Sequence, residues 1–160
     1  MRTLNIGCGK DSWGTDKLDN QNYQKGITHY DFNSGKRLPF KDGTFDEVRM
    51  HGVMEFMVYP QFMLEECNRV MKKSATLSIV TANMDSLRFF LRPFHGQVYN
   101  GKRKVFENGA VISPMNTYLL SRRLEIAGFK VVSTGTRSDV FPFQDNIKIS
   151  AIKISKKKIV

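Results

Sequence analysis

The chain has 160 residues, of which 41% are hydrophobic and 25% are charged. This balance suits one compact domain and argues against wholesale disorder. Lys and Arg number 25 against 15 Asp and Glu, a formal net charge of +10, which attracts phosphates or acidic surfaces; a soluble, self-repelling surface explains the charge equally well.

Short apolar runs spaced along the chain predict seven strands. They are residues 4–6, a short piece ending near Leu18-Asp19, and residues 27–32, 45–50, 76–81, 130–134 and 147–154. The run at 76–81 is nearly continuous and rich in β-branched residues, so we expect a strand buried on both faces. The run at 147–154 alternates, which leaves one of its faces open to solvent.

Longer amphipathic segments predict two helices. The first spans 60–73, where a stripe of apolar residues recurs at helical spacing: Met63, Leu64, Cys67, Val70 and Met71. The second spans 114–127, with Ser113 as its N-cap and Gly128 as its left-handed terminator. Residues 52–59 are expected to form a short, irregular helix. Strands interspersed with helices predict an α/β fold.

The first predicted strand ends in a glycine turn, Gly7-Cys8-Gly9. Glycine permits a sharp turn and lets a ligand lie against bare backbone, and ligands of open parallel sheets bind beyond the carboxyl ends of the strands. An acidic residue that ends the next strand would then accept hydrogen bonds from ribose hydroxyls. Asp19 is placed there, with Asp16 as a nearby rival, and an ordinary tight turn is the simpler interpretation.

Further blocks follow in a characteristic order. They are LPFKDGTFDEV at 38–48, NRVMK at 68–72 and IAGFKVV at 126–132. From about residue 3 to 134 the chain resembles the class I S-adenosylmethionine-dependent methyltransferases, in particular the small type 11 members. The resemblance implies a Rossmann-like three-layer sandwich with a mostly parallel seven-stranded sheet and an antiparallel last strand. It also implies a single methyltransferase-like domain over 1–160, with a basic tail at about 155–160.

The resemblance further implies S-adenosylmethionine as the cofactor, held along the carboxyl ends of strands one to four. Gly7 and Gly9 would approach its methionine part and ribose, and Asp19 would hold the ribose hydroxyls. The adenine edge and the sulfonium would be addressed by residues that follow strands three and four: Asp31 with the Phe32 backbone, and Met50 with His51. For Asp31, capping of the turn that follows it is an alternative.

Methyl transfer from a sulfonium mainly needs proximity and in-line alignment, and a base helps only where the accepting O or N loses a proton. His51 is the candidate base, because histidine titrates near neutrality; a structural or substrate-positioning role is the alternative. Glu55 could face the same pocket, although a solvent-facing position is the commoner outcome for such a residue. The acceptor stays open.

The link between strands one and two is short, so the first covering helix is expected to be abbreviated or absent. Asn5 and Asp11 depart from the family pattern. These departures, the charge and the Arg/Phe-rich segment within 85–112 favour a second hypothesis, a cofactor-degenerate binding module for nucleic acid or another anionic partner. A nicotinamide dehydrogenase is disfavoured, because Ser12 stands where a third glycine is expected.

The remaining expectations concern the setting of the protein. The two cysteines, Cys8 and Cys67, exclude a disulfide framework, and no metal site is expected. No apolar stretch approaches the roughly 18 residues that span a bilayer, and residues 1–20 lack a secretory leader. We therefore expect a cytoplasmic protein without a membrane partner. Its partners would be a small-molecule or anionic acceptor, with nucleic acid as a further candidate and the oligomeric state open.

Overall fold

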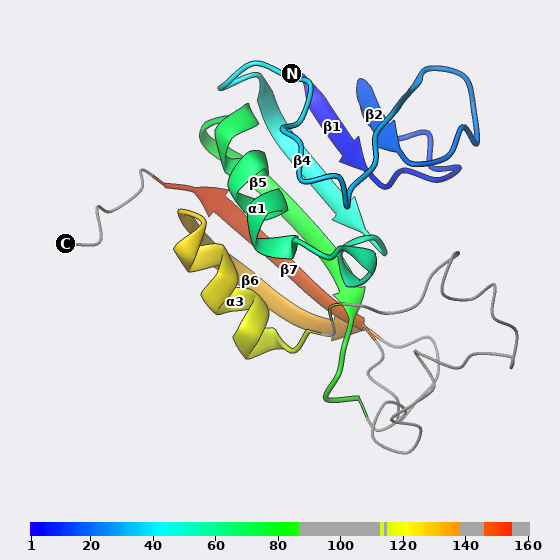
Figure 1. Ribbon diagram of the computed structural model, residues 1–160. Helices are drawn as coiled ribbons and strands as arrows, with labels where there is room; N and C mark the ends of the chain where they lie inside the picture. The colour runs from blue at the N-terminus through cyan, green and yellow to red at the C-terminus, as the bar shows by residue number, and fades with distance from the viewer. Residues whose placement is uncertain (87–112, 114, 138–145, 155–160) are drawn as a thin grey trace, which may run out of the picture.

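A computed structural model describes residues 1–86, 113, 115–137 and 146–154 of the protein (Figure 1). The segment at 87–112 and the tail at 155–160 lie outside the described residues. In chain order the elements are β1 (Thr3–Ile6), β2 (Asp16–Asp19), β3 (Ile27–His29), β4 (Phe45–His51), η1 (Met54–Phe56), α1 (Pro60–Val70), β5 (Met71–Ala82), α3 (Thr117–Ile126), β6 (Phe129–Arg137) and β7 (Asn146–Lys153).

The seven strands form one sheet in the order β3-β2-β1-β4-β5-β7-β6. Strands β1 to β5 pair in parallel, whereas β7 lies between β5 and β6 and is antiparallel to both. The mostly parallel sheet with an antiparallel last strand is therefore confirmed. The strand order reverses beside β1, because β2 and β4 flank it, and this reversal is the position at which open sheets bind ligands.

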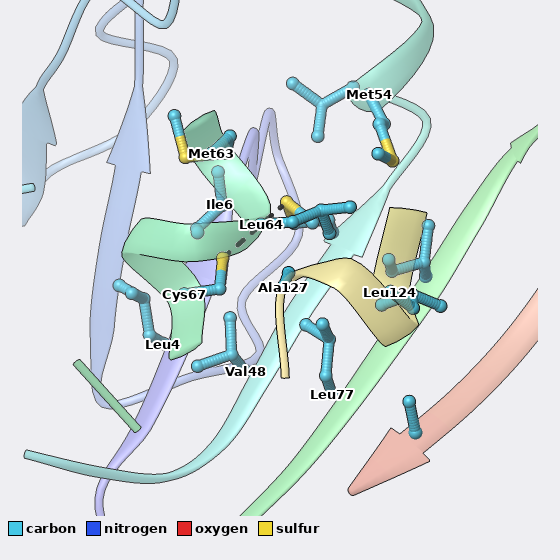
Figure 2. Close-up of a cluster of buried hydrophobic side chains, with 14 of the residues drawn as sticks. Leu4, Ile6, Val48, Met54, Met63, Leu64, Cys67, Leu77, Leu124 and Ala127 are labelled. Carbon is cyan, nitrogen blue, oxygen red and sulfur yellow. Dashed lines mark hydrogen bonds between the residues drawn. The ribbon is translucent and has the colours of Figure 1, made fainter. Parts of the chain in front are cut away.

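Helices α1 and α3 lie side by side on one face of the sheet (Figure 1), where the Asn68 side-chain amide of α1 donates to the carbonyl of Gly128, just after α3, at 3.0 Å. Between these helices and the sheet lies the hydrophobic core. Figure 2 shows Leu4, Val48 and Leu77 reaching up from three neighbouring strands towards both helices. The predicted apolar stripe of α1 is confirmed, since Met63, Leu64, Cys67 and Val70 are buried.

The other face of the sheet is polar and only partly covered. Along β5 the burial alternates, with Leu77 and Ile79 buried and Ser78 and Val80 half-buried. The expectation that this strand is buried on both faces is therefore wrong. Residues 7–15, 20–26 and 30–44, which join β1 to β4, contain no helix. The expected absence of the first covering helix is confirmed, and the described residues supply the sheet and one helical layer of the three-layer sandwich.

Helix and strand ends differ from the predicted ones where a backbone group finds another partner. Helix α1 ends at Val70 because Met71 is already extended and begins β5. Helix α3 begins at Thr117 and is capped by Asn116, whose side chain accepts from the Leu119 amide at 2.8 Å. Ser113 is not the N-cap; its hydroxyl donates to the Met57 carbonyl. The left-handed terminator is confirmed, since Gly128 has φ +88°.

The block at 38–48 is held by Arg69, near the end of α1. Its guanidinium donates to the carbonyls of Leu38 and Phe40 and to the carboxylates of Glu66 and Asp42, at 2.7–3.0 Å. The Glu66 carboxylate in turn accepts from the Leu38 amide at 2.8 Å. This network fixes the approach to β4 at the edge of the sheet opposite the glycine turn.

Replacing Arg69 by alanine is expected to lower the free energy of unfolding by about 3 kcal/mol, because it leaves the buried Glu66 carboxylate without its cation. Chemical denaturation measures this loss. The control is Arg122→Ala, which removes an exposed ion pair with Glu125 and should cost less than about 0.5 kcal/mol. Equal losses in the two variants would contradict a structural role for the Arg69 network.

Candidate functional site

The glycine turn lies at the carboxyl edge of the sheet, between β1 and β2. The amides of Gly7 and Cys8 both donate to the Leu18 carbonyl, at 2.8 and 3.2 Å. Gly7 and Gly9 have φ of +68° and +52°, in the left-handed region that favours glycine. A Cβ on Gly7 would lie 2.4 Å from the Cβ of Val53, whereas a Cβ on Gly9 would meet nothing within 4 Å. Gly7 is thus required by packing, and Gly9 offers bare main chain beside open space.

Asp19 ends β2 directly beside this turn. Its carboxylate accepts from the Gly9 amide at 2.7 Å and from the Gln21 amide at 3.0 Å, and the residue is only 4% exposed. Asp16, at the start of β2, is paired with Arg2 at 2.8 Å. Since the two aspartates occupy opposite ends of the strand, only Asp19 lies at the glycine turn.

The two glycines are expected to respond differently to alanine. Gly7→Ala should cost about 3 kcal/mol or more, because the new methyl group overlaps Val53 in addition to the left-handed strain. Gly9→Ala should cost about 1–2 kcal/mol, from strain alone. Thermal or urea unfolding of both variants measures the difference. Equal destabilisation would contradict the placement of Val53 against Gly7.

Asp31 and Phe32 follow β3, which ends at His29 rather than at the predicted residue 32. Asp31 is exposed, and its carboxylate accepts from the Asn33 amide at 2.9 Å, so it caps the turn as the alternative expected. Phe32 is buried, with its ring 5.6 Å from that of Tyr30. The turn is tied to the loop after η1, because the Asn33 side chain accepts from the Val58 amide at 2.7 Å.

Met50 and His51 end β4 and point to opposite faces of the sheet, as successive strand residues must. The Met50 side chain is fully buried and contacts the Cys67 thiol of α1, with 4.0 Å between the two sulfur atoms. His51 is on the polar face, where its Nε2 is hydrogen-bonded to the Ser78 hydroxyl at 3.0 Å. Burial, followed by the nearby Arg49 cation, lowers the pKa of His51, so the imidazole is neutral at pH 7.

Glu55 in η1 is a buried carboxyl, although a solvent-facing position was the commoner expectation. It is 7% exposed and accepts a hydrogen bond from the Thr81 hydroxyl at 2.9 Å. Burial raises the pKa of Glu55 above its usual range. No local pattern signals this burial, because it depends on contacts with distant parts of the chain. Thr81 of β5 donates to the Glu55 carboxylate, and the Ser113 amide donates to the Glu55 carbonyl at 3.0 Å.

The raised pKa of Glu55 makes the stability of the protein dependent on pH. As the pH rises above the pKa that Glu55 has in the unfolded chain, the free energy of unfolding falls. The reason is that the Glu55 carboxyl ionises more easily in the unfolded chain than in the native state. The stability of Glu55→Gln relative to the wild type should therefore increase from pH 4.5 to pH 8. Thermal unfolding of both proteins at the two pH values measures this change. The control is Glu125→Gln at an exposed position. An unchanged difference between wild type and Glu55→Gln at the two pH values would contradict the burial of an ionisable carboxyl.

Comparisons with known proteins identify a methyltransferase-like domain and fold. Residues 14–79 match a family model described as a methyltransferase domain. An uncharacterized protein of Methanocaldococcus jannaschii, MJ1123, is 29% identical over 103 residues, which are 62% of this chain and 47% of that protein. The chain therefore spans about half the length of the curated relative that it matches.

Solved methyltransferase structures share the fold. A possible histamine N-methyltransferase of Thermotoga maritima is 22% identical, with a TM-score of 0.67 over 96% of this chain and 82% of that one. A methyltransferase of Methanosarcina mazei is 15% identical, with a TM-score of 0.71 over 95% and 92%. The fold that the resemblance implies is therefore confirmed: the chain has the fold of these solved methyltransferases, and its residues 14–79 match the methyltransferase-domain family. The cofactor that this family implies is S-adenosylmethionine.

A putative methyltransferase of Haloferax volcanii, solved in complex with the Trm112 activator, is also similar in structure. It is 15% identical, with a TM-score of 0.66 over 94% of this chain and 80% of that one. None of the described helices is long and apolar enough to cross a membrane.

Proposed function

We propose that the protein binds S-adenosylmethionine at the carboxyl edge of the sheet and transfers its methyl group to an O or N acceptor. The observation that carries this proposal is the juxtaposition of Gly9 and Asp19. Gly9 has open space where a side chain would be, and the Asp19 carboxylate is fixed beside its amide at 2.7 Å. The ribose and methionine parts of S-adenosylmethionine require this combination of open space beside main chain and a fixed carboxylate.

The carboxylate of Asp19 keeps acceptor capacity for the ribose. Each of its two oxygens accepts one backbone amide, and a carboxylate offers about four lone-pair sites. Two sites therefore remain for the ribose hydroxyls. Gly7 shapes the turn, while Gly9 leaves open space where a Cβ would be, so that the donor can lie against its backbone.

Asp31 with the Phe32 backbone would address the adenine edge, from the turn after β3. The exposed Asp31 carboxylate uses one oxygen for the Asn33 amide, so the other is available to an adenine amino group. Met50 would contribute only main chain near the sulfonium, since its side chain is in the core.

The donor supplies an activated methyl group, and the residues of the chain orient the reactants. His51, neutral at pH 7 because its pKa is lowered, can accept a proton from the attacking O or N or position the acceptor. The alternative of a cofactor-degenerate binding module is not favoured, because Gly9 and Asp19 keep the features that a donor needs despite the departures at Asn5 and Asp11.

Isothermal titration with S-adenosylmethionine tests the proposal. The wild type should bind, and Asp19→Ala should weaken binding by about tenfold or more, since a hydrogen bond to a charged group contributes about 1.5–3 kcal/mol. Asp16→Ala is the matched control, because it removes the same charge from the other end of β2 and should leave binding unchanged. No binding at millimolar donor, or equal effects of the two variants, would overturn the proposal.

A further inference from the structure

The polar face of the sheet carries a cluster of cations at the end of β4. Within the sheet, His51 pairs with Val80 of β5, which pairs with Lys148 of β7. One row back, Arg49 pairs with Ser78. Side chains of paired residues project from the same face. Arg49, His51, Ser78 and Lys148, which we name the His51 cluster, therefore share one patch beside the glycine turn.

Arg49 is a cation with little neutralisation. Its guanidinium stacks on the Trp13 ring at 3.7 Å from the centroid, and the Glu47 carboxylate is 4.0 Å away, at the limit of an ion pair. Its Nε is buried without a hydrogen-bond partner among the described residues. A buried N–H without a partner is costly, so the guanidinium keeps hydrogen-bonding capacity that the described residues do not use.

The charges of the cluster act on one another. Arg49 and Lys148 both lower the pKa of His51, while Asp11 opposes them. Asp11 is held beside Asn5, whose side-chain amide donates to it at 3.3 Å. Lys148 is exposed, so it can reach a ligand without displacing a neighbour. The described charges that act on His51 are therefore two cations against one carboxylate, an excess of positive charge.

We infer that the His51 cluster binds the phosphate group of a small molecule and thereby anchors the methyl acceptor beside the donor. The anchoring role depends on the proposed function, whereas the phosphate site itself does not. Arginine donates to phosphate oxygens in a planar fork, and a lysine ammonium and a serine hydroxyl supply further donors. A phosphate dianion matches the two cations, and its negative charge favours the protonated form of the His51 imidazole.

A small phosphate compound suits the patch better than a polynucleotide. Glu47 lies two residues before Arg49 on the same face of β4, so a carboxylate interrupts the cations along the strand. Asp11 does the same on the side of the glycine turn. A nucleic acid strand needs a basic track for successive phosphates, whereas this compact cluster accommodates one.

The test is an NMR titration of the His51 ring with inorganic phosphate, at an ionic strength held constant with sodium chloride because salt alone screens the cations. Phosphate at about 10 mM, ten times a millimolar dissociation constant, should raise the pKa of His51. Lys148→Gln, an exposed substitution that should not disturb folding, should weaken phosphate binding by about fivefold or more. Arg49→Lys should weaken it as well, since lysine lacks the planar fork.

Two controls separate the outcomes. Lys73→Gln removes the same charge near the start of β5, at the other edge of the sheet, and should leave phosphate binding unchanged. Asp19→Ala should also leave it unchanged, so that failure of donor binding and failure of the phosphate site are distinguishable. The inference is overturned if phosphate does not move the pKa of His51, if Lys148→Gln and Lys73→Gln behave alike, or if only a single-stranded oligoribonucleotide binds.

Discussion

The sheet buries one face under two helices and leaves polar side chains on the other, and the rest of the molecule follows from this asymmetry. Leu4, Val48 and Leu77 point to the helical face, whereas Asn5, Arg49 and Ser78 alternate with them on the other. Packing a helix over the polar face would desolvate these groups without supplying partners. In agreement with this cost, the described connections between β1 and β4 contain no helix over the polar face.

In place of a helix, the loop after β1 covers part of the polar face through specific contacts. The Asn5 side-chain amide donates to Asp11 and to the Trp13 carbonyl, at 3.3 and 3.2 Å, and the Trp13 ring stacks on Arg49. The same loop contains Gly9, whose amide reaches the Asp19 carboxylate. The two positions that depart from the family pattern, Asn5 and Asp11, therefore hold the glycine turn in place in the absence of a helix.

One of the blocks that carry the family resemblance is remote from the candidate site. Residues 38–48 are clamped by Arg69 and Glu66 at the start of β4, while Gly9, Asp19 and His51 lie at the ends of β1, β2 and β4. The clamp stabilises the sheet from its amino edge. The proposed donor site is at its carboxyl edge, where open parallel sheets bind their ligands.

The sequence by itself determined the existence of the seven strands and the glycine turn, because periodicity and turn residues act between near neighbours in the chain. It also predicted an aspartate beside the glycine turn, since parallel strands end at the same edge of a sheet, but left Asp16 as a rival to Asp19. Only the tertiary structure decided which face of β5 is buried and that Asn116 rather than Ser113 caps α3. It also decided that Glu55 is buried, with a hydrogen bond from Thr81. The meeting of Arg49 and His51 with Lys148 likewise depends on the insertion of β7 between β5 and β6, a pairing between distant segments that no local pattern encodes.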